Sequence, residues 1–293
     1  MWYPTERCTV VLFKLHYLLG LFPAHFREGL TRENVHRAFA DLEQGAKKSE
    51  LWMTMAMKDM RQRYRRSILG PFWLTLSMGV FVAALSLLYA GILNQPLDEY
   101  LPYVASGFIV WGFTSAMVLD GAQTFTVNEG IIRQLPAPLS IYAYRMVFQS
   151  LIIFLHNILI YVVVALLFSI KPGASLLLAF PGLMLLCLNG LWMGLLLGLV
   201  SARFRDVPQI LASIIQVLFF LTPIIWRPDM LPERAFIVDL NPLYHFIEIV
   251  RAPLLGYVPS TETYLITLAI TLFGWSTAML LYTAYRWRIP YWV

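Results

Sequence analysis

The sequence predicts an all-α integral membrane protein with six transmembrane helices. Between residues 72 and 285, six long apolar stretches are joined by mostly short loops. Hydrophobic residues make up 59% of the chain and charged residues only 13%, about half the charged share of soluble domains. Because water cannot reach a backbone inside lipid, each stretch that crosses the bilayer has to satisfy its own hydrogen bonds as a helix.

The six predicted spans take up most of the chain. Each reaches or approaches the ~20 residues that a helix needs to cross the hydrocarbon core, and the third is long enough to tilt or to protrude. They cover Phe72–Leu93, Tyr103–Phe125, Ile141–Ile170, Ala174–Val200, Pro208–Ile225 and Tyr264–Tyr285.

Lysine and arginine near the span ends predict the orientation of the helices. With the N-terminus inside, the cytoplasmic set is Lys58, Arg61, Arg63, Arg65, Arg66, Arg133, Arg145, Arg203, Arg205, Arg286 and Arg288. The outer set is only Lys171, Arg227, Arg234 and Arg251. This excess of positive charge favours a cytoplasmic location for both termini. The modest net charge of +5 is explained in the same way, and no nucleic-acid partner is expected.

The chain divides into three regions. Residues 1–50 are expected to form a cytoplasmic segment, and an extension created by a misplaced gene start is a second interpretation of residues 1–34. Leu51–Arg66 has apolar residues on one side of a helical wheel and charges on the other, which is typical of an amphipathic helix in the membrane interface. A plain positive cluster that orients the first span is the alternative. Residues 67–293 form the transmembrane domain.

Two connections between the spans are unusual. The inner loop Val127–Ser140 interleaves apolar and charged residues before two prolines, which predicts a brief helix. The outer segment Trp226–Glu262 is long, rich in proline and still apolar. Its pieces Phe236–Leu240 and Leu243–Leu255 are each too short to span the bilayer, so they are predicted to be re-entrant or interfacial helices.

The chain lacks the motifs of catalysis and nucleotide binding. There is no GxxxxGK phosphate loop, so no ATP site is recognisable, and no GxSxG, HExxH or GxGxxG motif occurs. None of the five histidines has a second His or Cys at a metal-ligand spacing, so no metal site is expected. The two cysteines, Cys8 and Cys187, are not expected to form a disulfide. A transporter would therefore need an energy source on another protein.

Five short segments follow one another in the part of the chain after residue 50. They are RQRYRRSILGPFW (Arg61–Trp73), NEGIIRQLPAPLS (Asn128–Ser140), RFRDVPQIL (Arg203–Leu211), FFLTPIIW (Phe219–Trp226) and LNPLYHFIEIVR (Leu240–Arg251). Together they resemble the permease subunit of type-2 ABC exporters of bacterial polysaccharide, which move O-antigen of lipopolysaccharide, capsule or teichoic acid polymers. The resemblance covers about Leu51 to the C-terminus, and nothing is carried over to the earlier residues.

The resemblance implies a homodimer of six-span permeases with two ABC ATPase subunits below it in the bacterial inner membrane. ATP and Mg²⁺ would bind to those partners and no cofactor to this chain. The cargo would be a polysaccharide linked to a lipid such as undecaprenol. The inner loop would be the helix that couples ATPase closure to the spans, formed by Asn128, Glu129, Ile131, Ile132, Arg133, Gln134 and Leu135. A simple cytoplasmic turn is the plainer interpretation of this loop.

The outer segment would form the family's gate helices at the outer leaflet. The residues that would break the backbone or pair there are Pro223, Asn241, Pro242, Glu248 and Arg251. Glu248 and Arg251 lie three residues apart and can pair with each other on one helix. A rigid external cap is the alternative to a gate.

Flat aromatic side chains would suit a channel for a sugar polymer, because they stack on its C–H surfaces without fixed charge. The candidates in or near spans are Tyr89, Trp111, Trp192 and Trp226. Anchoring at the membrane interface is the ordinary role of such residues. Polar residues within spans, such as Asn189, are expected first to make interhelical hydrogen bonds.

Two other functions compete with polysaccharide export. An ABC permease for a drug or a small lipid would have the same architecture. An integral-membrane enzyme that modifies glycans would need clustered acids or histidines at one membrane face. Between the spans, however, the inner loops offer only Glu129 and Asp206 as acids.

Overall fold

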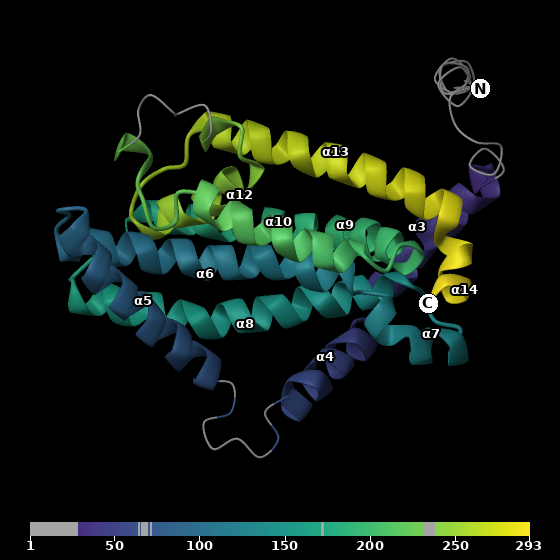
Figure 1. The fold of residues 1–293 in the computed structure, drawn as a ribbon. Helices are drawn as coiled ribbons and strands as arrows, with labels where there is room; N and C mark the ends of the chain where they lie inside the picture. The colour runs from purple at the N-terminus through teal and green to yellow at the C-terminus, as the bar shows by residue number, and fades with distance from the viewer. Residues whose placement is uncertain (1–28, 64, 66–69, 71, 171–172, 231–237) are drawn as a thin grey trace.

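The computed structural model describes residues 29–63, 65, 70, 72–170, 173–230 and 238–293. The described residues form helices and connecting segments without a strand. The long helices lie side by side in one bundle, and short helices cover its two ends (Figure 1). The fold is therefore all-α, as the sequence predicts.

Among the described residues, five helices are long and apolar enough to cross a membrane. Four of them are α5 (Phe72–Ile92), α6 (Leu97–Ala122), α8 (Ser140–Leu167) and α13 (Thr261–Tyr285). The fifth is α9 (Ala179–Arg203), which continues the short 3-10 turn η2 (Ala174–Leu178). Their ends lie within about three residues of the predicted ends, except that α6 begins at Leu97, six residues before the predicted start at Tyr103.

The fifth predicted span is shorter than expected. Helix α10 (Val207–Leu221) has 15 residues and is therefore about 22 Å long, less than the ~30 Å hydrocarbon core. The expected end at Ile225 is wrong, because the backbone turns extended at Thr222, with φ −90° and ψ 133°. Pro223 explains this end, since proline disfavours helical geometry in the residue before it. The prediction of a sixth full-length span therefore rests on α10 together with the non-helical segment 222–226 that follows it.

Helix α6 is the centre of the bundle. It packs against α5, α8, α9, α10 and α12. In its most apolar window, 78% of the residues are buried, against 17% for α5. Between α9 and α13, Asn189 Nδ2 donates to Thr271 Oγ1 at 2.8 Å, so this polar residue makes the interhelical hydrogen bond expected of it. Helix α5, by contrast, leaves most of its apolar surface uncovered.

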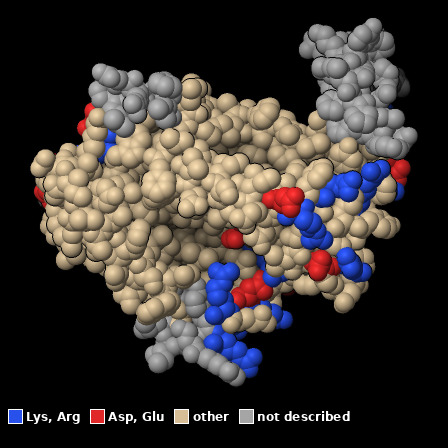
Figure 2. Space-filling view, viewed as in Figure 1, with Lys and Arg blue, Asp and Glu red and all other residues tan. Residues whose placement is uncertain are grey.

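The short helices at one end carry half of the charged residues that the structure describes. They are α3 (Arg32–Lys47), α4 (Ser49–Arg63), η1 (Thr126–Asn128), α7 (Glu129–Gln134), η5 (Arg286–Arg288) and α14 (Ile289–Trp292). Figure 2 shows lysine and arginine side chains gathered over this end, while the flank of the long helices is almost uncharged. We call it the charged end.

The N-terminal helices differ in part from expectation. Within residues 31–50, where only a polar segment was expected, α3 is a regular helix capped by the Thr31 hydroxyl. Helix α4 confirms the predicted helix up to Arg63, and the last predicted turn falls largely outside the described residues. Trp52 packs on Tyr144 of α8, with ring centroids 5.9 Å apart, whereas Met53 and Met57 remain exposed. The interpretation of residues 1–34 as an extension falls mostly outside the described residues.

The opposite end is covered by α12 (Pro242–Leu254), preceded by the turn η3 (Pro228–Met230). Helix α12 has 13 residues, too few to cross a membrane, and packs against α6, α9 and α13. It lies far from α7 along the bundle (Figure 1). The predicted short helix Leu243–Leu255 is confirmed within one residue. The other predicted short helix, Phe236–Leu240, is described only from Val238, and there Val238 and Asp239 are helical.

Candidate functional site

A buried arginine organises the end covered by α12. The Arg251 side chain is only 1% exposed, and its Nε and Nη2 donate to Glu248 Oε2 at 2.9 and 2.6 Å. Its Nη1 donates to the Pro223 carbonyl at 2.6 Å, and its guanidinium lies 4.3 Å from the ring centroid of Tyr103. A buried charge needs this number of partners to offset the loss of hydration. The predicted Glu248–Arg251 pair is therefore confirmed as part of a larger cluster.

Two tyrosines of α6 complete this cluster. Tyr103 Oη donates to the carbonyls of Pro223 and Trp226 at 3.0 and 3.1 Å. Tyr100 Oη donates to the carbonyl of Ile225 at 2.6 Å. A backbone that has left the helix lacks helical partners for its carbonyls, so these donors stabilise it where water is scarce. The segment 222–226 is thus fixed by side chains of α6 and α12.

Asn241 connects the same segment to the start of α12. Its Oδ1 accepts from the Leu243 backbone N–H at 3.0 Å, which caps the helix. Its Nδ2 donates to Thr222 Oγ1 at 2.8 Å. Pro242 occupies the first helical position, where its fixed φ is favourable. Pro223, Asn241, Pro242, Glu248 and Arg251 therefore lie together as one "outer cluster", which we define as these five residues with Tyr100 and Tyr103.

An acidic cavity borders the outer cluster. Its volume is about 410 Å³, and its charged lining consists of Asp98, Glu99, Arg227, Asp229 and Glu248. Burial, with a contribution from Glu248, raises the pKa of nearby Tyr244 to about 12, so this phenol stays neutral. The sequence analysis did not single out the residues of α6 that line this cavity. These residues lie in or beside an apolar span, so the sequence pattern around them did not distinguish them from the rest of the span.

At the charged end, α7 is held at its start by a chain of polar contacts. Asn128 Nδ2 donates to the Thr124 carbonyl at 2.7 Å, and its Oδ1 accepts from Arg145 Nη1 at 2.6 Å. Arg145 Nε donates to Asp59 Oδ2 of α4 at 2.6 Å, and Gln149 of α8 donates to the same oxygen at 2.5 Å. The start of α7 is thereby linked to both α8 and α4.

The C-terminal residues hold the rest of α7. Arg133 Nε donates to the Val293 carbonyl at 2.9 Å, and its Nη2 donates to the same oxygen. Arg205 lies 3.9 Å from Glu129 and donates to the Trp292 carbonyl at 3.2 Å. The turn after α9 and the C-terminal helix α14 therefore meet at α7.

The predicted residues of the inner loop divide into two groups. Asn128 and Ile132 are buried and attach the loop to the bundle. The exposed residues are Glu129, Ile131, Arg133, Gln134 and Leu135. This exposed surface mixes apolar and charged side chains at the tip of the charged end, where another protein can contact it.

The four aromatic candidates for a channel do not meet within one chain. Trp111 is buried against Phe219, with ring centroids 5.6 Å apart. Trp192 Nε1 donates to Asn189 Oδ1 at 2.8 Å, and Trp226 Nε1 to the Phe220 carbonyl at 3.1 Å. Tyr89 is partly buried against the core. A polysaccharide channel lined by these residues stays a prediction.

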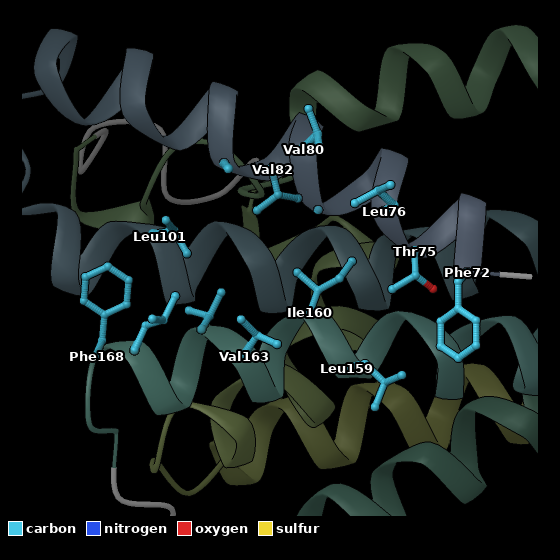
Figure 3. A pocket seen from close by; sticks show the side chains of 14 residues that line it. Phe72, Thr75, Leu76, Val80, Val82, Leu101, Leu159, Ile160, Val163 and Phe168 are labelled. Carbon is cyan, nitrogen blue, oxygen red and sulfur yellow. The ribbon is translucent and has the colours of Figure 1, made fainter. Parts of the chain in front are cut away.

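An apolar cavity of about 460 Å³ lies between α5 and α8. Figure 3 shows its lining, which is aliphatic and aromatic except for the Thr75 hydroxyl. Phe72 and Phe168 lie at its two ends (Figure 3). None of the four aromatic candidates lines this cavity or the acidic cavity beside α12.

Comparison with known proteins finds a family and several relatives that are similar to this chain. Residues 50–255 match the family model described as ABC-2 type transporter. Two Klebsiella pneumoniae proteins named O-antigen export system permease protein RfbA are similar to the chain. One is 22% identical over 200 residues, covering 68% of this chain and 77% of the relative. The other is 21% identical over 231 residues, covering 77% and 89%. A Myxococcus xanthus protein of the same name is 22% identical over 197 residues, covering 66% and 75%.

Proposed function

The chain belongs to the ABC-2 type transporter family, and on this premise we propose that it is the membrane-spanning subunit of an ATP-driven exporter of lipid-linked polysaccharide. It is a multi-pass protein of the bacterial inner membrane and a transport subunit rather than an enzyme. The observation that carries the choice of cargo is the similarity to three permeases named for O-antigen export.

The proposed energy source is a pair of ABC ATPase subunits that bind ATP and Mg²⁺ and contact α7. The exposed Ile131 and Leu135, flanked by Glu129 and Arg133, support this contact. Asn128, at the start of α7, contacts Arg145 of α8, which in turn contacts α4, and Arg133 contacts the C-terminal residues. Movement of α7 can therefore be transmitted to the bundle. The charged end would then face the cytoplasm, in agreement with its excess of lysine and arginine.

The proposed assembly is a homodimer with membrane lipid around it. Helix α10 buries only Ile215 among its 15 residues, and α5 is similarly uncovered. Apolar surface on these two helices can be covered by a second copy, by lipid, or by both. A channel between two copies would also explain why Tyr89, Trp111, Trp192 and Trp226 do not converge within one chain.

The proposed role of the outer cluster is to close the outer end of the channel. Helix α12 and the segment 222–226 are linked by directed polar contacts, so they can move as one unit or stay fixed as one cap. Release of the polymer would require α12 and the segment 222–226 to move together. Cysteine pairs that join α12 to α6 would block export by a moving gate and leave export through a fixed cap unchanged.

The proposed function is tested by reconstituting the chain with its proposed ABC ATPase partner. Vesicles that hold both proteins should move lipid-linked polysaccharide when ATP is added, and vesicles that hold the chain alone should neither hydrolyse ATP nor move polymer. Movement of a drug or a small lipid in place of polysaccharide would support the alternative cargo. ATP hydrolysis by the purified chain would contradict the proposal.

A further inference from the structure

A buried carboxylate on α3 connects three elements that are distant in sequence. Asp41 is 5% exposed, and its carboxylate accepts hydrogen bonds from four groups. The donors are the backbone N–H groups of Leu139 and Ser140, at 3.0 and 2.9 Å, the Tyr282 hydroxyl at 2.8 Å and Arg286 Nη1 at 2.9 Å. Burying a carboxylate without hydrogen-bond partners costs free energy. The four donors offset this cost and hold the Asp41 side chain in place.

The two backbone donors mark the start of α8. The first N–H groups of a helix have no partner within the helix and carry its positive partial charge. Asp41 therefore caps α8 from another helix, and the Ser140 hydroxyl returns a hydrogen bond to the Asp41 carbonyl at 2.7 Å. The end of the loop that begins with α7 is thus fixed on α3.

Helix α3 fits closely against both of its neighbours. A Cβ atom on Gly45 would lie 2.1 Å from Ser140 Oγ, and one on Gly29 would lie 2.6 Å from the Ala284 carbonyl of α13. Both distances are too short for any larger residue without movement of the backbone or of a packed side chain. Gly29 precedes α3 and Gly45 lies within it, so close approaches fix α3 on both sides of Asp41.

These contacts link α7 to Asp41 by two separate routes. Arg133 of α7 donates to Val293. Val293 follows η5 and α14, and Arg286, the first residue of η5, is paired with Asp41. From Asp41, the chain returns through Leu139 to the loop and to α7. The C-terminal residues that hold α7 and the loop that follows α7 therefore meet at one carboxylate.

We propose that Asp41 is a positioning residue that locks α3, α8 and the end of α13 together, so that movement of α7 is transmitted to the spans. The proposal rests on the proposed function, in which α7 receives the push of an ATPase. Without Asp41 to hold these elements together, the loop 135–139 and the C-terminal residues would shift when α7 moves, and the movement would not reach the spans. Helix α3, which lies before the part of the chain that matches the family, would then belong to the transmission machinery.

The test is Asp41→Asn in the complex with the partner ATPase, reconstituted in vesicles. The amide keeps the size of the side chain but loses its charge and part of its accepting capacity. We expect the amount of polysaccharide moved per ATP hydrolysed to fall roughly fivefold or more, the usual scale of coupling between sites. Tyr282→Phe removes one of the four donors and should lower the same ratio less, which gives a milder variant if Asp41→Asn folds poorly.

The matched control is Glu43→Gln, the same chemical change on the same helix. Glu43 is exposed and binds Lys47 one turn further along, at 2.5 Å. The hydrogen bond and the charge of Lys47 lower the pKa of Glu43. Within the part of the chain that the structure describes, no hydrogen bond or ion pair joins Glu43 to another element. This variant should keep the wild-type ratio. A merely structural role of Asp41 would reduce the amount of complex and lower both rates in proportion, and an unchanged ratio would overturn the proposal.

A second measurement separates this proposal from the proposed function. With Cys8 and Cys187 replaced by serine, spin labels at Gly130→Cys and Trp287→Cys report the distance between α7 and η5. The lock predicts that this distance stays constant through the ATP cycle in the otherwise wild-type chain and in Glu43→Gln, and that it changes in Asp41→Asn. A change without the Asp41 substitution would overturn the lock. A complex that moves no polysaccharide while the distances behave as expected would refute the proposed function alone.

Discussion

At the scale of single residues, Arg251 shows how this protein keeps a charge inside an apolar bundle. Its guanidinium uses Glu248, the Pro223 carbonyl and the face of Tyr103 at once. Removing one partner of such a buried pair leaves the other charge without compensation. The stability of the outer end should therefore depend on this one side chain.

We expect Arg251→Met to lower the free energy of unfolding by about 3–5 kcal/mol, the usual cost of breaking a buried pair. The measurement is denaturant-induced unfolding of the protein in detergent micelles. Arg37→Met serves as control, because Arg37 pairs with Glu33 on the exposed side of α3 and should contribute less than about 1 kcal/mol. Equal losses in the two variants would contradict the structural role assigned to Arg251.

The residue scale is also where the sequence was least informative. Tyr100, Tyr103 and Asp41 were not singled out, although each makes directed contacts with distant segments. A tyrosine in an apolar stretch has the composition of an ordinary span, and an aspartate among polar residues has the composition of an exposed helix. By contrast, proline, asparagine and an i,i+3 ion pair have local meanings, so the other five residues of the outer cluster were found.

At the scale of elements, the start of α12 depends on one asparagine with two separate tasks. Asn241 Oδ1 caps the helix, and Nδ2 donates to Thr222 at the end of α10. The two tasks can be separated by substitution, because aspartate keeps the accepting oxygen and loses the donor.

We expect Asn241→Ala to lower the free energy of unfolding by about 2 kcal/mol, from loss of the cap and of the hydrogen bond. Asn241→Asp should keep the cap and lose only the contact with Thr222. Unfolding in micelles measures both variants, and protease sensitivity after α10 reports the loss of the contact. Identical behaviour of the two variants would show that the cap contributes nothing.

Helix α7 offers a second test at this scale. Glu129 and Arg205 are exposed and lie 3.9 Å apart, so their pair should contribute little to stability. We expect Glu129→Arg to reduce export while ATP hydrolysis by the partner continues, because it places two positive charges together where α7 contacts the turn after α9. Export of surface polysaccharide in cells is the readout.

The matched reversal is the double variant Glu129→Arg with Arg205→Glu, which restores opposite charges with their places exchanged. It should recover part of the export lost in Glu129→Arg. Normal export in the single variant would contradict a coupling role for α7.

At the scale of the whole molecule, the distribution of burial indicates where other molecules belong. Helix α6 is enclosed, whereas α5 and α10 present apolar surface, and charge gathers at one end (Figure 2). Apolar surface on long helices suits lipid or a second copy, and a charged tip suits a soluble partner.

We therefore expect the purified complex to contain two copies of this chain and two ATPase subunits. Native mass spectrometry in detergent measures this stoichiometry directly. The double variant Ile131→Asp with Leu135→Asp should release the ATPase subunits and leave the dimer of this chain intact. A complex with one copy of each protein would contradict the proposed channel between two copies.

The positions of the long helices could be predicted from local composition, because the free energy of placing a segment in lipid depends on its own composition and length. The sequence by itself also predicted the short helices α7 and α12, since proline and asparagine end or begin a helix through local geometry. The tertiary structure alone decided which polar groups meet. Asp41 and Tyr282 are 241 positions apart, and their contact depends on how α3 packs on α8 and α13. No local pattern carries that information, because packing selects partners by shape and distance in space.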